Sequence, residues 1–211
     1  MNFSRRDHWQ SVYQEKEAIQ TSWYRAHLEQ SLYCIDSLEL DKDRPVVDVG
    51  GGRSTLVDDL LGRSFHDVTV VDLSAKALAE ARQRLGTRSQ AVTWTEGDVN
   101  EIDWIKGHYV LWHDRAVFHF LTDGGDRARY VAGVTHSVQP GGYAILATFA
   151  SDGPERCSGL SVRRYDATAL AAEFTPSFKM VSQYRDLHQT PAGRQQPFTY
   201  VVLRRAKTPR E

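Results

Sequence analysis

The feature that most constrains the fold is a short apolar strand that runs into an acid and then into a cluster of glycines. The apolar run is 46–49, with Asp48 inside it, and Gly50 to Gly52 follow at once. This pattern is typical of a buried strand that turns sharply, where glycines let a ligand approach the backbone closely. A second apolar run ends at Asp72, twenty residues after Gly52. At that spacing a carboxylate accepts hydrogen bonds from both hydroxyls of a ribose. The two segments predict a nucleoside-binding α/β domain.

Three features favour S-adenosylmethionine over a dinucleotide. Asp48 places a negative charge where a pyrophosphate would lie, and this charge suits a cationic ligand instead. The third glycine or alanine of the dinucleotide pattern is missing, and the series continues from Gly52 to Ser54. A third acid, Asp98, precedes Val99 after another strand-like run and suits an adenine amino group. Acids for an ammonium group, a ribose and an adenine predict S-adenosylmethionine as the cofactor.

The chain resembles the class I S-adenosylmethionine-dependent methyltransferases over nearly its whole length. The matching segments are Asp48–Gly52, Asp72–Ser74, Gly97–Val99 and Val138–Thr148. The resemblance implies a Rossmann-like, doubly wound seven-stranded sheet with a reversed C-terminal β-hairpin. It also implies one domain over 1–211, in which 1–40 form a helical extension that covers the cofactor. The cofactor-binding residues it implies in the core are Asp48, Gly50, Gly51, Gly52, Ser54, Asp72, Leu73, Asp98 and Val99.

Hydrophobic periodicity gives the expected order of elements. It predicts strands at 46–49, 68–71, 91–95, 109–112 and 143–149, with helices at 56–62, 75–85 and 123–138 between them. Ser74 is the expected N-cap of the helix at 75–85, and Gly86 is expected to end it. Strands that alternate with helices require a parallel sheet, which binds ligands at the carboxyl ends of its strands. The last sixty residues predict a helix at 167–174 and a closing hairpin of strands 178–188 and 198–204.

Aromatic residues near the N-terminus are candidates for a cover over the cofactor. Trp9 and Tyr13 share one helix face, and Trp23 follows. Aromatic faces stabilise cations such as a sulfonium. The pattern His8-Trp9-Gln10-x-x-Tyr13 resembles the opening of thiopurine methyltransferase and related enzymes, which implies that Trp9, Tyr13 and Trp23 contact the cofactor. The alternative is that these rings only pack the extra helix on the sheet.

The segment after the fourth predicted strand holds the candidate catalytic residues. His113 has the pKa range to take a proton from a thiol or an amine, and Asp114 is placed to orient it or to bind a cationic substrate. His113 is also a candidate cofactor contact, and His119 is the second candidate base. The alternative for each histidine is a packing role. Asp114-Arg115-Ala116 resembles an element of the thiopurine and tellurite-resistance methyltransferases and, more loosely, of the methyltransferase-like lysine enzymes.

The loop after the fifth predicted strand contains glycines, a proline and mixed polar groups, a composition that suits substrate binding. Arg156 is a candidate clamp for a carboxylate or oxyanion. Cys157 is a candidate contact for a thiol or metalloid, with a buried structural thiol as the alternative. Arg115 and Tyr165 complete the predicted substrate-binding set. The spacings of histidine, cysteine and acidic residues predict no metal site.

Composition sets limits on partners and location. The chain has 211 residues, 41% of them hydrophobic, and a formal net charge of -1. This balance fits one globular unit and predicts no nucleic-acid partner. The two cysteines imply no disulfide framework, and no apolar run is long enough for a membrane span. We expect a cytoplasmic protein without a membrane partner, and the sequence leaves its oligomeric state open.

The predicted function is methyl transfer from S-adenosylmethionine to a small-molecule nucleophile, with a thiol, selenol or metalloid acceptor favoured through the Asp114-Arg115 resemblance. Two alternatives stay open. One is a protein lysine N-methyltransferase, which would need an open, acidic mouth. The other is a regulator that binds S-adenosylmethionine without catalysis.

Overall fold

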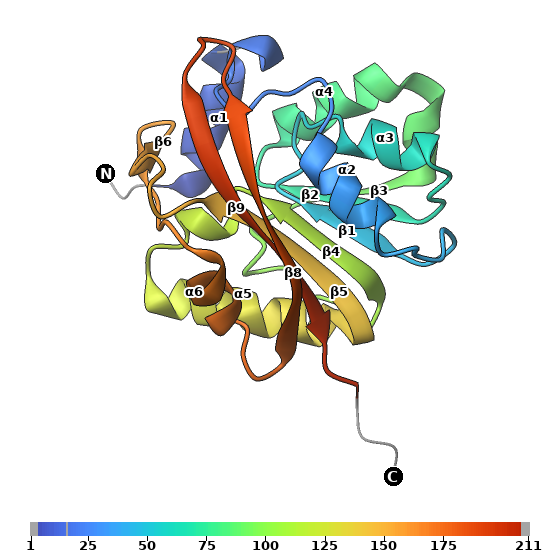
Figure 1. The fold of residues 1–211 in the computed structure, drawn as a ribbon. Coiled ribbons are helices and arrows are strands. Elements are labelled where there is room, and N and C mark those ends of the chain that lie inside the picture. The colour runs from blue at the N-terminus through green and yellow to red at the C-terminus, as the bar shows by residue number, and fades with distance from the viewer. Residues whose placement is uncertain (1–3, 16, 208–211) are drawn as a thin grey trace. The chain divides into compact units, whose positions relative to one another are not determined.

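The computed structural model describes residues 4–15 and 17–207. Seven strands form a mostly parallel sheet in the order β3-β2-β1-β4-β5-β9-β8 (Figure 1). The last strand along the chain, β9, lies antiparallel to β5, as a reversed C-terminal hairpin requires. The predicted fold class is therefore confirmed. The chain divides into two compact units, which are Met1–Ile102 with Gln189–Gln195, and Asp103–His188 with Gln196–Glu211.

The first unit holds three parallel strands, which are β1 (Val46–Val49), β2 (Val68–Asp72) and β3 (Val92–Glu96). Its helices are α1 (Arg5–Glu15), α2 (Glu29–Asp36), α3 (Leu56–Gly62) and α4 (Ala75–Leu85), with short 3-10 helices at Ala18–Gln20 and Gly86–Ala91. Both β1 and β2 are buried along their full length. This burial explains why both strands are mostly apolar on both faces, because a parallel strand covered on both faces has no solvent-exposed side.

Helix α4 follows the predicted capping chemistry. The Ser74 hydroxyl accepts a hydrogen bond from the backbone N–H of Ala77 at 3.2 Å, and Gly86 ends the helix with φ 59°. Its buried residues are Ala77, Leu78, Ala81 and Leu85, at the spacing of one helix face. A defined start to α4 fixes the chain that leaves the carboxyl end of β2.

The second unit contains β4 (Tyr109–Arg115), α5 (Gly124–Ser137), β5 (Val138–Phe149) and α6 (Ala167–Ala172), with most of β8 (Phe178–Gln189) and β9 (Gln195–Arg205). A 3-10 helix at Phe118–Phe120 follows β4, and the short strands β6 (Arg156–Cys157) and β7 (Leu160–Ser161) pair with each other. Strands β8 and β9 form a long hairpin (Figure 1). Strand β4 pairs in parallel with β5.

The second unit differs most from the sequence prediction at strands β4 and β5. In addition, α6 ends at Ala172 rather than at 174, and β9 begins at Gln195 rather than at 198. Strand β4 continues to Arg115, so His113 and Asp114 lie on the strand and not after it, because the ladder with β5 runs on through both. Strand β5 begins at Val138 rather than at 143, and its pairing with β4 shifts register near Gly141, where φ is 82°. A glycine accepts this conformation inside an irregular strand.

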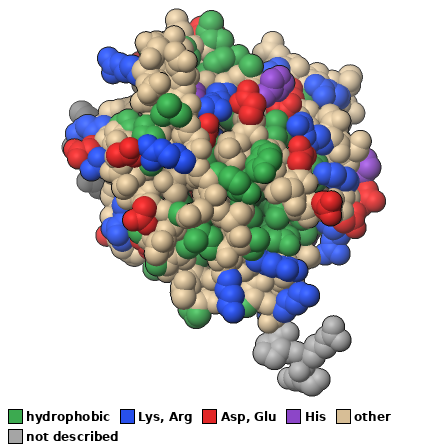
Figure 2. All heavy atoms as spheres, in the orientation of Figure 1, with side chains coloured by type: hydrophobic (Ala, Val, Ile, Leu, Met, Phe, Trp, Pro, Cys, Tyr) green, Lys and Arg blue, Asp and Glu red, His purple; other side chains and the backbone are tan. Residues whose placement is uncertain are grey.

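Surface chemistry adds two observations. On the face shown in Figure 2, basic and acidic side chains are interspersed and form no single basic field. Over the described ranges 4–15 and 17–207, no helix combines the length and the apolar composition that a membrane crossing requires.

Candidate active site

The glycine loop after β1 leaves space that side chains would fill. Gly50 and Gly52 have φ values of 67° and 40°. A Cβ atom at Gly52 would lie 2.8 Å from both Asp72 Oδ2 and the Tyr13 hydroxyl, and one at Gly51 would lie 2.6 Å from Asp48 Oδ2. Both distances are too short for a carbon contact, so only glycine fits. The loop is therefore a backbone cradle with acids on its rim, which fits a ligand carrying an ammonium group and a ribose.

Asp72 ends β2 and is 7% exposed. Its carboxylate accepts a hydrogen bond from the Ser74 backbone N–H at 2.8 Å, and also from those of Gly52 and Leu73. The pKa of Asp72 is raised to about 7, chiefly by burial and also by the negative charge of Asp48, against the lowering effect of the three N–H donors. Two buried acids that repel each other favour a ligand that brings positive charge and hydroxyl donors.

Helix α1 makes polar contacts at the carboxyl end of each strand of the first unit. Gln10 contacts the hydroxyl of Ser74, just after β2. The backbone carbonyl of Tyr13 accepts a hydrogen bond from Arg53 Nη2, in the glycine loop, at 2.5 Å. Arg6 pairs with Glu96, the last residue of β3, at 2.6 Å. These contacts fix α1 across the edge at which parallel sheets bind ligands.

The predicted aromatic residues come together on this helix and the segment that follows it. The ring centroids of Trp9 and Tyr13 are 6.2 Å apart, and Trp23 lies 5.7 Å from Trp9 and 6.1 Å from Tyr13. Tyr13 is buried, with its hydroxyl near the Gly52 backbone. The three rings form one cluster beside the glycine loop, and their contact with a bound cofactor stays a prediction.

Arg53 is a part of this site that the sequence reasoning missed. Its guanidinium pairs with Glu80 of α4 and lies over the Tyr13 ring, 5.1 Å from the centroid. Burial of an arginine normally requires such a partner, and both the acid and the ring are supplied here. The sequence signal that could have indicated this role is an arginine directly after a glycine cluster. An arginine at such a buried position requires an acidic partner from another part of the chain. Arg53 therefore links the loop, α4 and α1.

The remaining predicted cofactor contacts also lie in the first unit. The Ser54 hydroxyl accepts a hydrogen bond at 3.1 Å from the N–H of Leu56, the first residue of α3. A contact between Ser54 and the cofactor, as predicted, would use the same hydroxyl oxygen. Asp98 Oδ1 accepts a hydrogen bond from the Asn100 N–H at 2.9 Å and stabilises the turn after β3. Val99 is buried and Leu73 is partly exposed. Their cofactor roles stay predictions.

In the second unit, Asp114 is committed to internal hydrogen bonds. It is completely buried, and it accepts hydrogen bonds from the backbone N–H groups of Val117 at 2.8 Å and Phe118 at 3.0 Å, and from the hydroxyl of Tyr130. Burial raises its pKa to about 6 against these donors. Asp114 therefore anchors the chain that leaves β4. His113, beside it on the strand, is 2% exposed.

His119 is buried as a neutral side chain. Its Nδ1 accepts a hydrogen bond from the Phe149 N–H at 3.4 Å, and its ring packs edge-on against the Phe149 ring. Burial lowers the pKa of His119 to about 3, with a further contribution from the positive charge of Arg115. A histidine with so low a pKa takes up little proton near neutral pH, which makes it a weak general base. Its catalytic role stays a prediction.

The predicted substrate-binding residues have different surroundings. The Arg115 guanidinium lies over the Phe198 ring, 4.4 Å from its centroid. Arg156 is exposed and donates to the Gly159 carbonyl at 2.5 Å, and Cys157 is buried in the short strand β6. The Tyr165 hydroxyl donates to Glu173 at 3.0 Å, and burial raises its pKa. The structure gives each residue an internal contact or burial, and their substrate roles stay predictions.

Comparison with known proteins gives one family match and one curated relative. Residues 46–142 match the family described as a methyltransferase domain. The eEF1A lysine and N-terminal methyltransferase of Mus musculus is 21% identical over 154 residues, which are 70% of this chain. The chain spans 22% of the length of that relative.

Solved structures share the fold over nearly the whole chain. One, from work on conversion of a disulfide bond into a thioacetal group during echinomycin biosynthesis, has a TM-score of 0.78 and 16% identity, and the match covers 96% of this chain and 94% of that chain. Another is the Burkholderia thailandensis 1,6-didemethyltoxoflavin-N1-methyltransferase with bound 1,6-didemethyltoxoflavin and S-adenosylhomocysteine, with a TM-score of 0.67, 22% identity and coverage of 93% and 81%. Residues 46–142 therefore match a methyltransferase domain, and the chain as a whole has the fold of S-adenosylmethionine-dependent methyltransferases of known structure.

Proposed function

We propose that this methyltransferase acts on a small-molecule nucleophile, with a sulfur acceptor favoured. The observation that carries the proposal is helix α1, which is fixed across the carboxyl ends of β1, β2 and β3 by Gln10, the Tyr13 carbonyl and Arg6. A helix held at this edge leaves less open surface there for a macromolecule to grip. An enclosed site favours an acceptor that fits inside it.

The residues of the first unit would hold the cofactor. Asp72 would accept from the ribose hydroxyls, Asp48 would face the ammonium group, and Asp98 would accept from the adenine amino group. The aromatic cluster of Trp9, Tyr13 and Trp23 would face the cationic centre. When bound, S-adenosylmethionine supplies a methyl group on a positively charged sulfur. The chain then has to hold an acceptor in line with that methyl group, which contributes most to the rate.

A sulfur acceptor needs less help from a catalytic base than an amine does. A thiol ionises near pH 8.5, close enough to neutral for modest help from a base, whereas an amine stays protonated. His113 is the group that would take this proton, since His119 is a weak base and Asp114 is engaged by three donors. The structure from work on echinomycin biosynthesis, which concerns conversion of a disulfide bond into a thioacetal group, is a precedent for sulfur chemistry on this fold.

A protein acceptor is the second candidate, because the curated relative is named as a lysine and N-terminal methyltransferase. This candidate needs room for a lysine side chain, and the contacts of α1 count against it. The loose Asp114-Arg115 resemblance fits either class. The two candidates differ in the acceptor atom, which is sulfur in one and nitrogen in the other.

The test is transfer of labelled methyl groups from S-adenosylmethionine to matched acceptors. The panel is a set of small thiols, the same compounds with the thiol replaced by an amine, and lysine-containing peptides and folded proteins. The proposal expects turnover with small thiols that exceeds turnover with peptides or proteins by at least about tenfold, a difference of roughly 1.4 kcal/mol in the barrier. Preferential methylation of protein lysine would overturn it. The variant Asp72→Ala serves as the cofactor-deficient control.

A further inference from the structure

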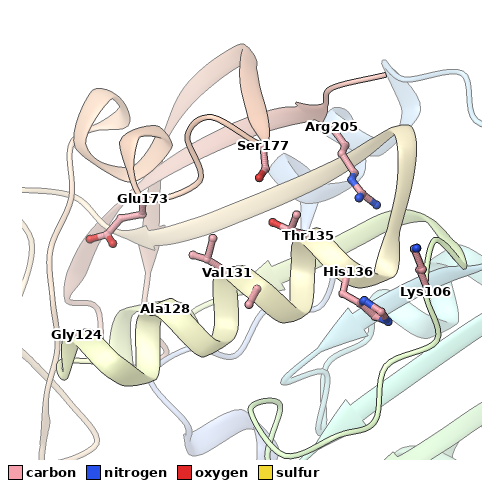
Figure 3. Close-up of a pocket in the computed structure, with 10 residues that line it drawn as sticks. Lys106, Gly124, Ala128, Val131, Thr135, His136, Glu173, Ser177 and Arg205 are labelled. Atoms are coloured by element: carbon pink, nitrogen blue, oxygen red, sulfur yellow. The ribbon is translucent and has the colours of Figure 1, made fainter. Parts of the chain in front are cut away.

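A cavity lies in the second unit, along one face of α5. It has a volume of about 650 Å³. The last residue of β9, Arg205, and Lys106 in the loop before β4 border it at one end (Figure 3). Arg205 ends β9, and the carbonyl that it contacts belongs to Val138, the first residue of β5. The cavity therefore lies at the amino end of β5, whereas the parallel strands carry their predicted catalytic residues toward the carboxyl ends.

One end of this cavity is basic. Lys106, His136 and Arg205 all line it, and Figure 3 draws their side chains around the same space. No acidic partner contacts any of these three side chains within 4–15 and 17–207. Burial lowers the pKa of Arg205, which means that its charge is partly removed from water without a carboxylate to compensate. Such a charge is stabilised by an anion from outside.

The end of α5 accounts for only part of this positive charge. Basic residues commonly lie near a helix C-terminus, where the helix dipole amounts to about half a negative charge. The last carbonyls of α5 already have partners, since Gly107 donates to the His136 carbonyl at 2.8 Å and Val138 donates to that of Val134. A lysine, an arginine and a histidine together therefore exceed what the helix end requires.

The cavity also has an acidic lining residue, Glu173, which lies away from the basic end and pairs with Arg127 and the Tyr165 hydroxyl (Figure 3). The part between Glu173 and the basic end is suited to an ester rather than to a bare ion. Its floor on α5 consists of the small apolar residues Ala128, Val131 and Ala132. Two hydroxyl residues, Thr135 and Ser177, lie between this floor and the basic end (Figure 3). The Thr135 hydroxyl oxygen is buried beneath the cavity lining and has no hydrogen-bond partner among the described residues. Because this oxygen has almost no surface open to the cavity, the Thr135 side chain has to rotate before its hydroxyl can donate to a ligand oxygen.

We propose that this cavity binds a small phosphate monoester whose apolar or aromatic body lies on the floor of α5. The phosphate oxygens accept hydrogen bonds from Lys106 and Arg205, and from the hydroxyl of Thr135. The volume is within the range of small-molecule sites. The site lies on residues other than those assigned to the cofactor or to methyl transfer, so it serves to bind an effector and not the methyl acceptor.

Calorimetry on the full chain tests the proposal with phenyl phosphate, phenol and inorganic phosphate, each in the presence of saturating S-adenosylhomocysteine, which blocks the cofactor site. The proposal expects phenyl phosphate to bind more tightly than inorganic phosphate, with no binding of phenol in the same range. Binding should weaken as salt is raised.

The variants Lys106→Glu and Arg205→Gln should each weaken phenyl phosphate binding by at least about tenfold, the size expected for loss of a charge-assisted contact. Lys179→Glu, which changes an exposed lysine of β8, is the matched control and should leave binding unchanged. Because Lys106 is exposed, its variant tests the site even if Arg205→Gln does not fold. Absence of phenyl phosphate binding, or equal loss in the Lys179 control, would overturn the site and leave the methyltransferase assignment untouched.

Discussion

The two units use buried acids in different ways. In the first unit, Asp72 ends β2 beside the glycine loop and accepts hydrogen bonds from the backbone N–H groups of Gly52, Leu73 and Ser74. In the second unit, Asp114 lies near the end of β4, and both of its oxygens accept hydrogen bonds from its own chain. Both carboxylates are buried and hydrogen-bonded, and the difference is that Asp72 lies beside a glycine loop that matches a cofactor motif, whereas Asp114 anchors the turn after its strand.

This difference teaches what a motif can and cannot reveal. Binding of one fixed ligand requires the same acids and glycines at the same strand ends, so their spacing in the sequence carries the information. An acceptor has no fixed chemistry, and an acid beside a histidine is equally compatible with catalysis and with a turn anchor. Three substitutions and one pH titration test the comparison, from the largest expected effect to the smallest.

Gly52→Val should have the largest effect. Gly52 has φ 40°, and a Cβ there would lie 2.8 Å from Asp72 Oδ2 and from the Tyr13 hydroxyl. The new side chain would enter the cradle and strain the backbone, so binding of S-adenosylhomocysteine should weaken by more than about 10²-fold. Calorimetric titration measures the dissociation constant for S-adenosylhomocysteine. The control is Gly62→Val, where a Cβ meets no atom within 4 Å. Normal binding by Gly52→Val would make the loop a structural turn only.

His113→Ala tests the proposed base in the second unit. If the acceptor arrives protonated, turnover should fall by roughly 10²-fold, with partial recovery as the pH rises and the acceptor ionises in solution. The affinity for S-adenosylhomocysteine should stay near normal. A loss confined to that affinity would make His113 a cofactor contact, and unchanged turnover at every pH would show that the acceptor ionises without help.

Asp114→Ala should reduce stability more than it changes cofactor binding. The substitution leaves two buried backbone N–H groups and the Tyr130 hydroxyl without their acceptor. The expected loss is about 3 kcal/mol in the free energy of unfolding, measured by urea denaturation. Asp103→Ala, an exposed acid of the same unit, is the control. A variant with wild-type stability but no turnover would restore Asp114 as a catalytic group.

The pH dependence of cofactor binding should give the smallest effect. Asp72 must be ionised to accept from the ribose and to face a cationic ligand, and its pKa is raised to about 7. The ionised fraction therefore decreases as the pH falls through 7, so affinity should be up to about tenfold weaker at pH 6 than at pH 8. Asp72→Asn should remove most of this dependence. A wild-type affinity that is flat across this range would mean that Asp72 is already ionised throughout.

Much of the first unit could be predicted from its sequence, because local patterns decide its elements. The bounds of β1, α3 and α4 match the prediction, and Ser74 caps α4 as expected. The role of Arg53 was not predicted, because its partners, Glu80 and the Tyr13 carbonyl, are far away in sequence. A buried ion pair leaves no periodic signal that a single sequence displays.

The second unit was less predictable for a related reason. Strand β4 extends to Arg115 because β5 pairs with it, and β5 itself begins at Val138 despite Pro140 and two glycines. Sheet pairing between segments distant in sequence outweighs local propensity at both places. The internal partners of Asp114 and His119 depend on that same packing, so the sequence could name these residues but could not tell a buried anchor from an active group.

The most direct test of the account is calorimetric titration of S-adenosylhomocysteine into the wild-type chain and Asp72→Ala at pH 8, with Glu101→Ala, an exposed acid of the same unit, as the control. Loss of the acceptor for two ribose hydroxyls should weaken binding by at least about tenfold, measured at a temperature where every variant is folded, because the substitution also leaves the N–H groups of Gly52, Leu73 and Ser74 without their acceptor. Equal dissociation constants for the wild type and Asp72→Ala would contradict the assignment of the cofactor site to the first unit.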